Sequence, residues 1–481
     1  MVDNPTKIYN DYVRANLPNG MSYDTGTDRY DINNHSFFKF KNSNWYYTYI
    51  SKYGYSALTA YAVNGLEPAL VFDFKGNYFR KSATDSTFGA SITHARASSA
   101  TMMNSSGTLV TVGNNVPRTG HHIYNGSAWV NEGILHESEA RTNQMVNSGD
   151  LTGAGWSGGA ARGSVTAGSP FGTYQFISPS FSSATISPAQ RYQIGKAITS
   201  GATYVGWSLV KYSAGSGWFV VNMFDTGKSN EQAYFDLQNG VVGSKNALII
   251  DHGMVDYGDG WWLCWASANA ASTSGGVSYE IPNGDNVQSC SSADVILIAG
   301  SQFEQGATPS SYIPTTTATV TRAAETLTVP AANLPYDSTN MSIQMDGKMT
   351  YADNDGDNGK MFSWHLNNSN NIYSMLSTYQ ARTGAIYWVQ ESGNVLDAVT
   401  GPATSYSPDT NVPFNFASRH GSTFINGAIS GTALTANTTP TALPNLSSTD
   451  LNLGETFMGT IGEFRMWSDD LGDVGIVEAS T

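Results

Sequence analysis

The chain has 481 residues, and its 24 lysines and arginines against 38 aspartates and glutamates give a net charge of −14. Charged residues make up only 13% of the chain, about half the usual share, so its polarity comes from glycine, serine, threonine and asparagine. An acidic chain without a cluster of basic residues lacks the surface that binds phosphate, which argues against a nucleic-acid partner. No apolar run approaches the roughly 20 residues of a membrane span, so no membrane insertion is expected.

The start of the chain and its cysteines indicate where it is made. Residues 1–5 (MVDNP) contain neither the basic nor the apolar part of a secretory signal. Two cysteines, Cys264 and Cys290, are too few for a disulfide framework. The two would pair if neighbouring strands brought them together, but cysteine is equally common as a small buried apolar residue. We expect synthesis in a reducing cytoplasm, which favours free thiols.

Residues 1–70 differ from the rest in their tyrosine content. They contain ten tyrosines and no long apolar run, so this stretch is not expected to bury a core by itself. Tyrosine provides contact area at a low cost in side-chain entropy, which is typical of docking surfaces. A docking or trimer-forming segment is therefore favoured over a small independent β-domain.

The remainder of the chain is dominated by short alternating strands. Helical periodicity is nearly absent, and the two best helix candidates, 229–237 and 469–479, are short. Strands are predicted at 205–210, 218–221, 295–298 and 461–467. Turns are predicted between strands at Asn239-Gly240, Asn283-Gly284-Asp285 and Asn426-Gly427. Many short strands separated by turns predict an all-β fold of sandwiches or jelly rolls.

The strand pattern divides the chain after residue 70 into three stretches. Residues 71–143 are predicted to form a compact β-rich connector with hairpins, and 144–322 and 323–481 each carry a dense set of strands. Pro309, Pro314 and the threonines at 315–317 mark the joint between the last two. No repeat of 20 to 50 residues is visible, which argues against a propeller or a long β-helix.

A group of tryptophans in the 144–322 stretch has two interpretations. Strand alternation places Trp262 and Cys264 on one face, and Trp261, Leu263 and Trp265 on the other. An exposed tryptophan stacks well on a sugar ring. Strands, however, usually bury aromatic residues, so a core position is favoured for most of these side chains and least firmly for Trp261. The same alternatives apply to Tyr373, Tyr379, Tyr387 and Trp388, where the polar context shifts the balance slightly toward exposure.

One acidic cluster has the spacing of a metal site. Asp353, Asp355 and Asp357 alternate with asparagine and glycine, and their carboxylates are the oxygen ligands that Ca²⁺ prefers. The EF-hand pattern fails because its sixth position is Asn358 and its twelfth is Trp364. Aspartate, asparagine and glycine also favour plain turns. An exposed hairpin loop is therefore favoured over a Ca²⁺ site, and no other cofactor is expected.

No motif for catalysis stands out. The chain has no G-x-S-x-G or H-E-x-x-H sequence, and His121-His122 lies in a glycine-flanked loop without a carboxylate at ligand spacing. A pair of catalytic carboxylates would meet only in the folded chain, so this alternative stays open. The chain is predicted not to be an enzyme.

An ordered series of short motifs nevertheless makes the chain recognisable. It consists of LVFDFKG at 70–76, THARASSAT at 93–101, NVPR at 115–118, GILHESEARTN at 133–143, FDLQNG at 235–240, GWWLC at 260–264, QFEQG at 302–306, SYIPT at 311–315 and VTRA at 320–323. This series resembles a module widespread in tail-fibre, tail-spike and other host-interaction proteins of tailed bacteriophages and prophages. The resemblance covers about residues 70–481.

The resemblance implies a fold for each stretch. Residues 144–322 look like a jelly roll of the carbohydrate-binding-module type. Residues 323–481 are similar to a concanavalin A-like (laminin-G-like) sandwich, with Asn426-Gly427 in the place of a hairpin turn. Residues 71–143 would be the connector, and residues 1–70 would attach the chain to the virion. The family has no fixed set of catalytic or sugar-binding residues, so none is transferred to this chain.

The function that the resemblance implies is adsorption without chemistry. The chain is expected to be a tail fibre, spike or head fibre that binds a host-surface glycan. It is expected to act as a homotrimer in the virion, after assembly with other virion proteins in the host cytoplasm. The alternatives are a purely structural tail or capsid decoration protein and a glycan-depolymerising spike. A bacterial surface adhesin ranks last because no secretion signal is visible.

Overall fold

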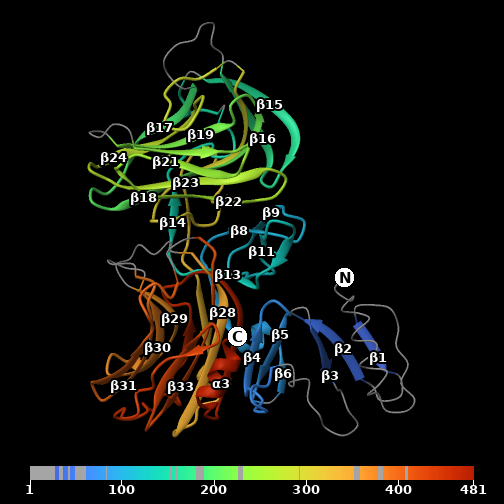
Figure 1. Cartoon of the computed structure of the whole chain (residues 1–481), viewed down its shortest axis with the longest axis vertical. Helices are drawn as coiled ribbons and strands as arrows, with labels where there is room; N and C mark the ends of the chain where they lie inside the picture. The colour runs from blue at the N-terminus through green and yellow to red at the C-terminus, as the bar shows by residue number, and fades with distance from the viewer. Residues whose placement is uncertain are drawn as a thin grey trace.

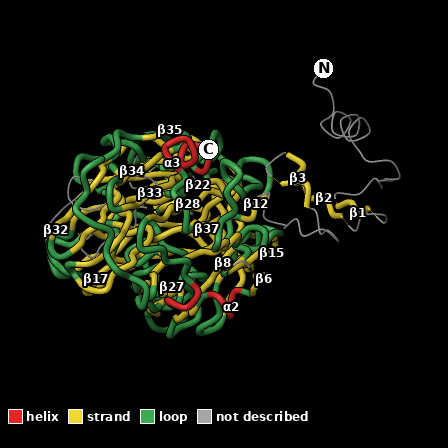
Figure 2. Tube along the Cα trace, turned by 90° about the horizontal axis from the view of Figure 1, so that it is seen from below, coloured by secondary structure: helices red, strands yellow, loops and turns green. Residues whose placement is uncertain are grey.

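The computed structural model describes the backbone of three strands between residues 28 and 48 and most of the chain from residue 61 on. From residue 61 it leaves out 83, 152, 159, 180–188, 226–230, 292, 351–357, 378–382 and 407–409, and it describes the backbone alone at 160–168, 172–179, 189–191 and 224–225. Strands and loops make up nearly all of the described chain (Figure 2), which confirms the predicted all-β fold.

The helices within the described residues are short. They are α2 (Phe88–Ser91), α3 (Gly472–Ala479) and the 3₁₀ turn η2 (Ala331–Asn333). Helix α3 confirms the candidate at 469–479. The candidate at 229–237 is wrong, because Gln232–Asp236 forms strand β20. Within the described part of the chain, no helix is long and apolar enough to cross a bilayer.

The first sandwich consists of two antiparallel sheets (Figure 1). The six-stranded sheet has the order β15 (Ala160–Ser169), β16 (Gly172–Pro179), β25 (Val295–Gln305), β18 (Thr203–Ala214), β23 (Trp261–Asn269) and β22 (Ile249–Asp256). The five-stranded sheet has the order β17 (Ala189–Ala197), β24 (Ser274–Ile281), β19 (Trp218–Asp225), β20 and β21 (Val241–Lys245). The strands predicted at 205–210, 218–221 and 295–298 lie in β18, β19 and β25.

The tryptophans of β23 divide between two apolar clusters as their alternation predicts. Trp262 and Cys264 face the core between the two sheets, whereas Trp261, Leu263 and Trp265 belong to a cluster on the opposite face of the six-stranded sheet. Trp261 and Trp265 are each 1% exposed, so the core interpretation holds even for Trp261. Cys264 and Cys290 are both buried and are not joined by a disulfide, as favoured above.

The second sandwich is larger, and its strands come from the chain segments before and after the first sandwich. Its ten-stranded sheet contains β35 (Thr432–Ala433), β34 (Ile425–Ile429), β33 (Val412–Gly421), β28 (Asn340–Met349), β37 (Met458–Trp467), β4 (Leu70–Asp73), β5 (Tyr78–Lys81), β6 (Thr84–Ser86), β13 (Ile134–Glu137) and β10 (Arg118–Thr119). Its seven-stranded sheet contains β32 (Val395–Thr400), β31 (Ile386–Ser392), β30 (Asn370–Leu376), β29 (Gly359–Asn367), β36 (Leu451–Leu453), β27 (Thr326–Val329) and β7 (Thr93–Ala95).

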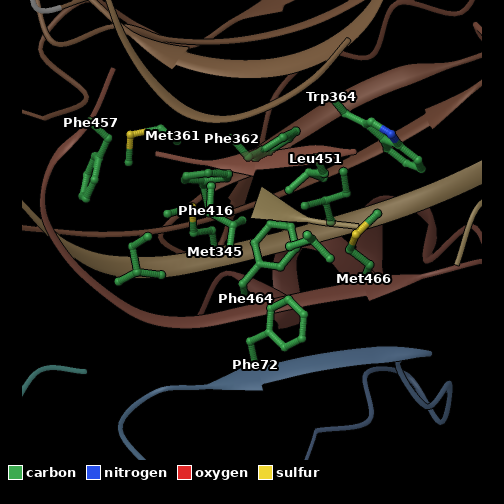
Figure 3. Packing of buried hydrophobic residues seen from close by; sticks show 14 of the residues in the cluster. Phe72, Met345, Met361, Phe362, Trp364, Phe416, Leu451, Phe457, Phe464 and Met466 are labelled. Carbon is green, nitrogen blue, oxygen red and sulfur yellow. The ribbon is translucent and has the colours of Figure 1, made fainter. Parts of the chain in front are cut away.

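The stretch predicted as a connector contributes strands to both of these sheets. Strands β4 and β13 pair with β37, and β7 pairs with β27. Phe72 of β4 points toward Phe464 in the core that the two sheets enclose (Figure 3), and their ring centroids are 6.2 Å apart. The first sandwich is therefore an insertion between two segments that fold together.

Short ribbons occupy the space between the sandwiches (Figure 1). They are β8 (Ala100–Met103) with β9 (Leu109–Val112), β11 (His122–Tyr124) with β12 (Trp129–Asn131), and β14 (Arg141–Asn143) with β26 (Val320–Arg322). Because β14 and β26 are antiparallel partners, the chain enters and leaves the first sandwich side by side. A separate three-stranded sheet contains β1 (Asp28–Asp31), β2 (Ser36–Lys41) and β3 (Asn44–Thr48).

One prediction about the second sandwich is wrong. Asn426-Gly427 is not a turn: both residues lie inside β34, and Asn426 is fully buried. Trp388 is fully buried, so of its two interpretations the core position is the correct one. The two side chains are related, because a Cβ atom on Gly427 would lie 2.3 Å from the Trp388 ring. The glycine is there to admit the indole, not to turn the chain.

Candidate functional site

A buried ionic network joins the two sandwiches. Its centre is Glu325, which is 2% exposed. One carboxylate oxygen of Glu325 accepts hydrogen bonds from Arg96 Nη1 and, at 3.0 Å, from Arg118 Nε. The other oxygen accepts from Arg118 Nη2 at 2.8 Å and from the backbone N–H of Glu137 at 2.9 Å. These residues come from segments far apart in sequence, so the network fixes how those segments meet.

The Glu137 carboxylate extends this network toward the first sandwich. It lies 2.7 Å from Arg118 Nη2 and 2.6 Å from Arg322 Nη1. It also accepts hydrogen bonds from the backbone N–H and the hydroxyl of Ser311, at 2.8 and 2.6 Å. Four of the recognisable motifs (93–101, 115–118, 133–143 and 311–315) thus meet here, together with Arg322 of a fifth motif (320–323). These five motifs therefore contribute to the architecture of the junction.

The charges of the network set the protonation states of its carboxyl groups. Burial by itself would raise the pKa of Glu137, but Arg322 and Arg118 outweigh it and lower the pKa to about 2. Burial is likewise outweighed at Glu325, where Arg118 above all holds the pKa well below its ordinary value. Both groups are therefore carboxylates at neutral pH.

This protonation behaviour predicts a pH dependence of stability. Because the pKa of Glu137 falls from an ordinary 4.5 to about 2 on folding, its stabilising contribution is complete above pH 4.5 and is lost as the pH falls toward 2. The stability difference between the wild type and Glu137→Gln is expected to be constant from pH 7 to 4.5 and to shrink below that. Urea midpoints measured between pH 7 and 2 test this, and a difference that grows with acidity would contradict it.

Beside the network, a cleft of about 100 Å³ opens at the junction. Its walls come from the ribbons β8–β9 and β11–β12, from the first sandwich at Asp256 and Tyr257, and from the second sandwich at Met458 and Gly459. On a comparable measure one water molecule needs about 10–15 Å³, so the cleft has room for several waters or a group the size of one sugar ring. Glu137 forms part of the cleft wall, which connects the cleft to the ionic network.

Aromatic rings form one wall of the cleft. Tyr124 and Trp129 face each other across β11–β12, with ring centroids 5.6 Å apart, and Tyr257 packs edge-on against Trp129 at 5.8 Å. Glycines hold the first two rings in place. A Cβ atom on Gly107 would lie 2.1 Å from the Trp129 ring, and one on Gly258 would lie 3.1 Å from Tyr124. All three aromatic residues are partly exposed.

Two adjacent histidines supply polar groups to the cleft. Nδ1 of His121 accepts a hydrogen bond from the backbone N–H of Met103 at 3.2 Å, so the ring proton of the neutral form is on Nε2. Burial, reinforced by Arg118, lowers the pKa of His121 to about 3, so the ring is neutral at physiological pH. His122 bonds the Gly120 carbonyl through Nδ1 at 2.8 Å, which leaves its Nε2 as an acceptor.

Further polar groups in the cleft are left without a hydrogen-bond partner among the described residues. They are the Nε2–H of His121, the hydroxyls of Tyr124 and Tyr257, and Oδ2 of Asp256, whose Oδ1 accepts from the Gly258 N–H at 2.8 Å. Burial raises the pKa of Tyr257 to about 12, which keeps its hydroxyl protonated. Partly exposed aromatic residues beside donors and acceptors that have no protein partner are typical of a small-molecule site.

The residues predicted from the sequence lie elsewhere. Trp261, Trp265 and Trp388 are buried and offer no platform, and Trp262, Tyr373 and Tyr387 are half-buried outside the cleft. Tyr379 and the candidate Ca²⁺ ligands Asp353, Asp355 and Asp357 lie outside the described residues. Within the described ranges no group of three or more histidines, cysteines or acidic residues is arranged to hold a metal.

Sequence reasoning missed the cleft because its residues come from segments that meet only in the fold. His121-His122 has no carboxylate nearby in sequence and therefore gave no sign of a site, yet the structure places Asp256 in the same cleft. The local signal that was available was the concentration of aromatic residues around two glycine-rich loops, at 120–129 and 257–262.

No protein-family model and no curated protein matches this chain. Solved structures that are similar include a leech intramolecular trans-sialidase, with 17% identity over 30% of this chain and 23% of that one, at a TM-score of 0.25. Another is the CBM40 module of the Ruminococcus gnavus IT-sialidase bound to α2,6-sialyllactose, with 12% identity over 30% of this chain and 84% of the module, at a TM-score of 0.25.

A third similar structure is the receptor-binding domain of botulinum neurotoxin mosaic serotype C/D, with 17% identity over 32% of this chain and 39% of that one, at a TM-score of 0.26. This chain thus spans less than two thirds of the leech enzyme and of the toxin domain. Likenesses of this size assign neither a ligand nor a partner to the chain.

Proposed function

We propose that this chain is a non-catalytic glycan-binding protein that serves as a host-adsorbing appendage of a tailed-phage virion. The observation that carries the proposal is the cleft at the junction of the sandwiches, where partly exposed aromatic residues lie beside polar groups that have no hydrogen-bond partner among the described residues. Sugars present an apolar ring face surrounded by hydroxyl groups, and this combination of surfaces is complementary to both.

The state of the acidic groups supports binding rather than hydrolysis. Glycosidases use a carboxylic acid of raised pKa paired with a second carboxylate. Glu137, which lines the cleft, has a pKa of about 2 and is held by two arginines and Ser311, so it has no proton to donate at neutral pH. Among the described residues that line the cleft, Asp256 is the other acidic one.

The virion role rests on the ordered motifs of the sequence. In this proposal residues 1–70 attach the chain to other virion proteins, and homotrimers present several clefts to the same cell. A single-sugar contact of about millimolar affinity would then be strengthened by avidity. In the alternative, a purely structural decoration protein, residues 1–70 would still attach the chain to the virion, but the chain would bind no host glycan.

Binding of the fluorescently labelled full-length protein to susceptible host cells tests the proposal. Saturable labelling is expected, and Tyr124→Ala is expected to weaken it by about tenfold, since stacking on a ring contributes roughly 1 kcal/mol or more. Tyr387→Ala, at a half-buried tyrosine outside the cleft, is the matched control and is expected to label like the wild type. Absence of labelling on every susceptible host would favour the purely structural role, and release of oligosaccharides would favour a depolymerase.

A further inference from the structure

The charges around the cleft bear on which sugars it accepts. Among the described residues that line it there is no lysine or arginine, whereas Glu137 and Asp256 are acidic. Arg118 and Arg322 lie behind Glu137, but their guanidinium groups are engaged by Glu137 and Glu325. Lys348, on the second sandwich, is paired with Glu132 at 2.9 Å. The described part of the cleft therefore provides no unpaired lysine or arginine side chain that could bind an incoming anion.

The hydrogen-bonding groups of the cleft are mixed in kind. His121 Nε2–H is a donor, His122 Nε2 and Asp256 Oδ2 are acceptors, and the hydroxyls of Tyr124 and Tyr257 can be either. A sugar hydroxyl both donates and accepts, so it satisfies either kind of partner. A carboxylate only accepts, so it can form no hydrogen bond with His122 Nε2 or Asp256 Oδ2, and the negative charge of Asp256 would repel it.

We infer that the cleft binds one neutral pyranose residue, stacked against the Tyr124 and Trp129 wall, and excludes sugars that carry a carboxylate, such as sialic and uronic acids. This inference rests on the proposed function and specifies its ligand class. Asp256 is the specificity-determining residue of this inference. Its Oδ2 accepts a hydrogen bond from a hydroxyl group of a neutral sugar, and its negative charge repels the carboxylate of an acidic sugar.

A glycan array that pairs neutral oligosaccharides with counterparts carrying sialic or uronic acid tests the inference on the full-length protein. Neutral members are expected to bind at least tenfold more tightly than their acidic counterparts at low ionic strength. Tyr257→Phe, which removes one hydroxyl and keeps the ring, is expected to weaken the neutral binding several-fold. Asp256→Asn is expected to reduce the preference for neutral over acidic members several-fold. Asp251→Asn, on the same strand but outside the cleft lining, is its matched control and should leave the preference unchanged.

The outcomes separate this inference from the proposed function. Equal or tighter binding of acidic sugars, still weakened by Tyr124→Ala, would overturn the inference and leave the cleft as a glycan site. Glycan binding that neither Tyr124→Ala nor Tyr257→Phe affects would place the site elsewhere and overturn the inference while glycan adsorption stands. Binding of no glycan, together with no labelling of cells, would overturn both.

Discussion

Replacing Glu325 with alanine is expected to lower the free energy of unfolding by about 3–5 kcal/mol, the usual cost of removing one partner from a buried ion pair. Arg96 and Arg118 are 1% and 0% exposed, and both direct their guanidinium groups at this carboxylate. Without it, Arg96 would lose its carboxylate partner, and Arg118 would share the carboxylate of Glu137 with Arg322. Urea denaturation followed by tryptophan fluorescence measures the loss.

A surface ion pair provides the matched control. Glu455 pairs with Lys360 at 3.3 Å, and both side chains are 30% exposed. Glu455→Ala is expected to cost less than about 1 kcal/mol, because solvent screens such pairs. If Glu325→Ala were no more destabilising than Glu455→Ala, the network would not hold the junction together.

The fold was predictable wherever the signal was local. Alternation along β23 placed Trp262 and Cys264 on one face and Trp261 and Trp265 on the other, because side chains of a strand point in opposite directions in turn. Of the two short helix candidates, the one at 469–479 contains helix α3, whereas the one at 229–237 contains strand β20, which pairs with β19. The sequence of a short segment does not show which strand it will pair with, which explains why the candidate helix at 229–237 was wrong.

The candidate site depends on contacts that no local pattern records. The order of the motifs indicated a family resemblance, but only the fold shows that Arg96 and Arg118 both donate hydrogen bonds to the carboxylate of Glu325. In the same way, His121 and Asp256 are far apart in sequence and share one cleft. The neutral state of His121 follows from its burial, which residue identity alone does not reveal.

The error at Asn426-Gly427 leads to the second large prediction, which concerns Trp388. This side chain is fully buried, and its ring centroid lies 6.1 Å from that of Phe416 across the core. Trp388→Ala is expected to destabilise the chain by about 3–5 kcal/mol, because the core cannot fully close over the space left by an indole. Gly427→Ala is expected to cost about 1–3 kcal/mol by overpacking, since its new methyl group would lie 2.3 Å from the Trp388 ring.

The two substitutions are expected to be coupled. In the double variant the alanine at 427 projects into the space that the indole vacates, so its total cost should be lower than the sum of the single costs by at least about 1 kcal/mol. Gly89→Ala is the control for adding a methyl group, because no atom lies within 4 Å of the site of a Cβ atom there, and it should be nearly neutral. Additive costs in the double variant, measured by the same urea denaturation, would show that Gly427 is required for some reason other than the tryptophan above it.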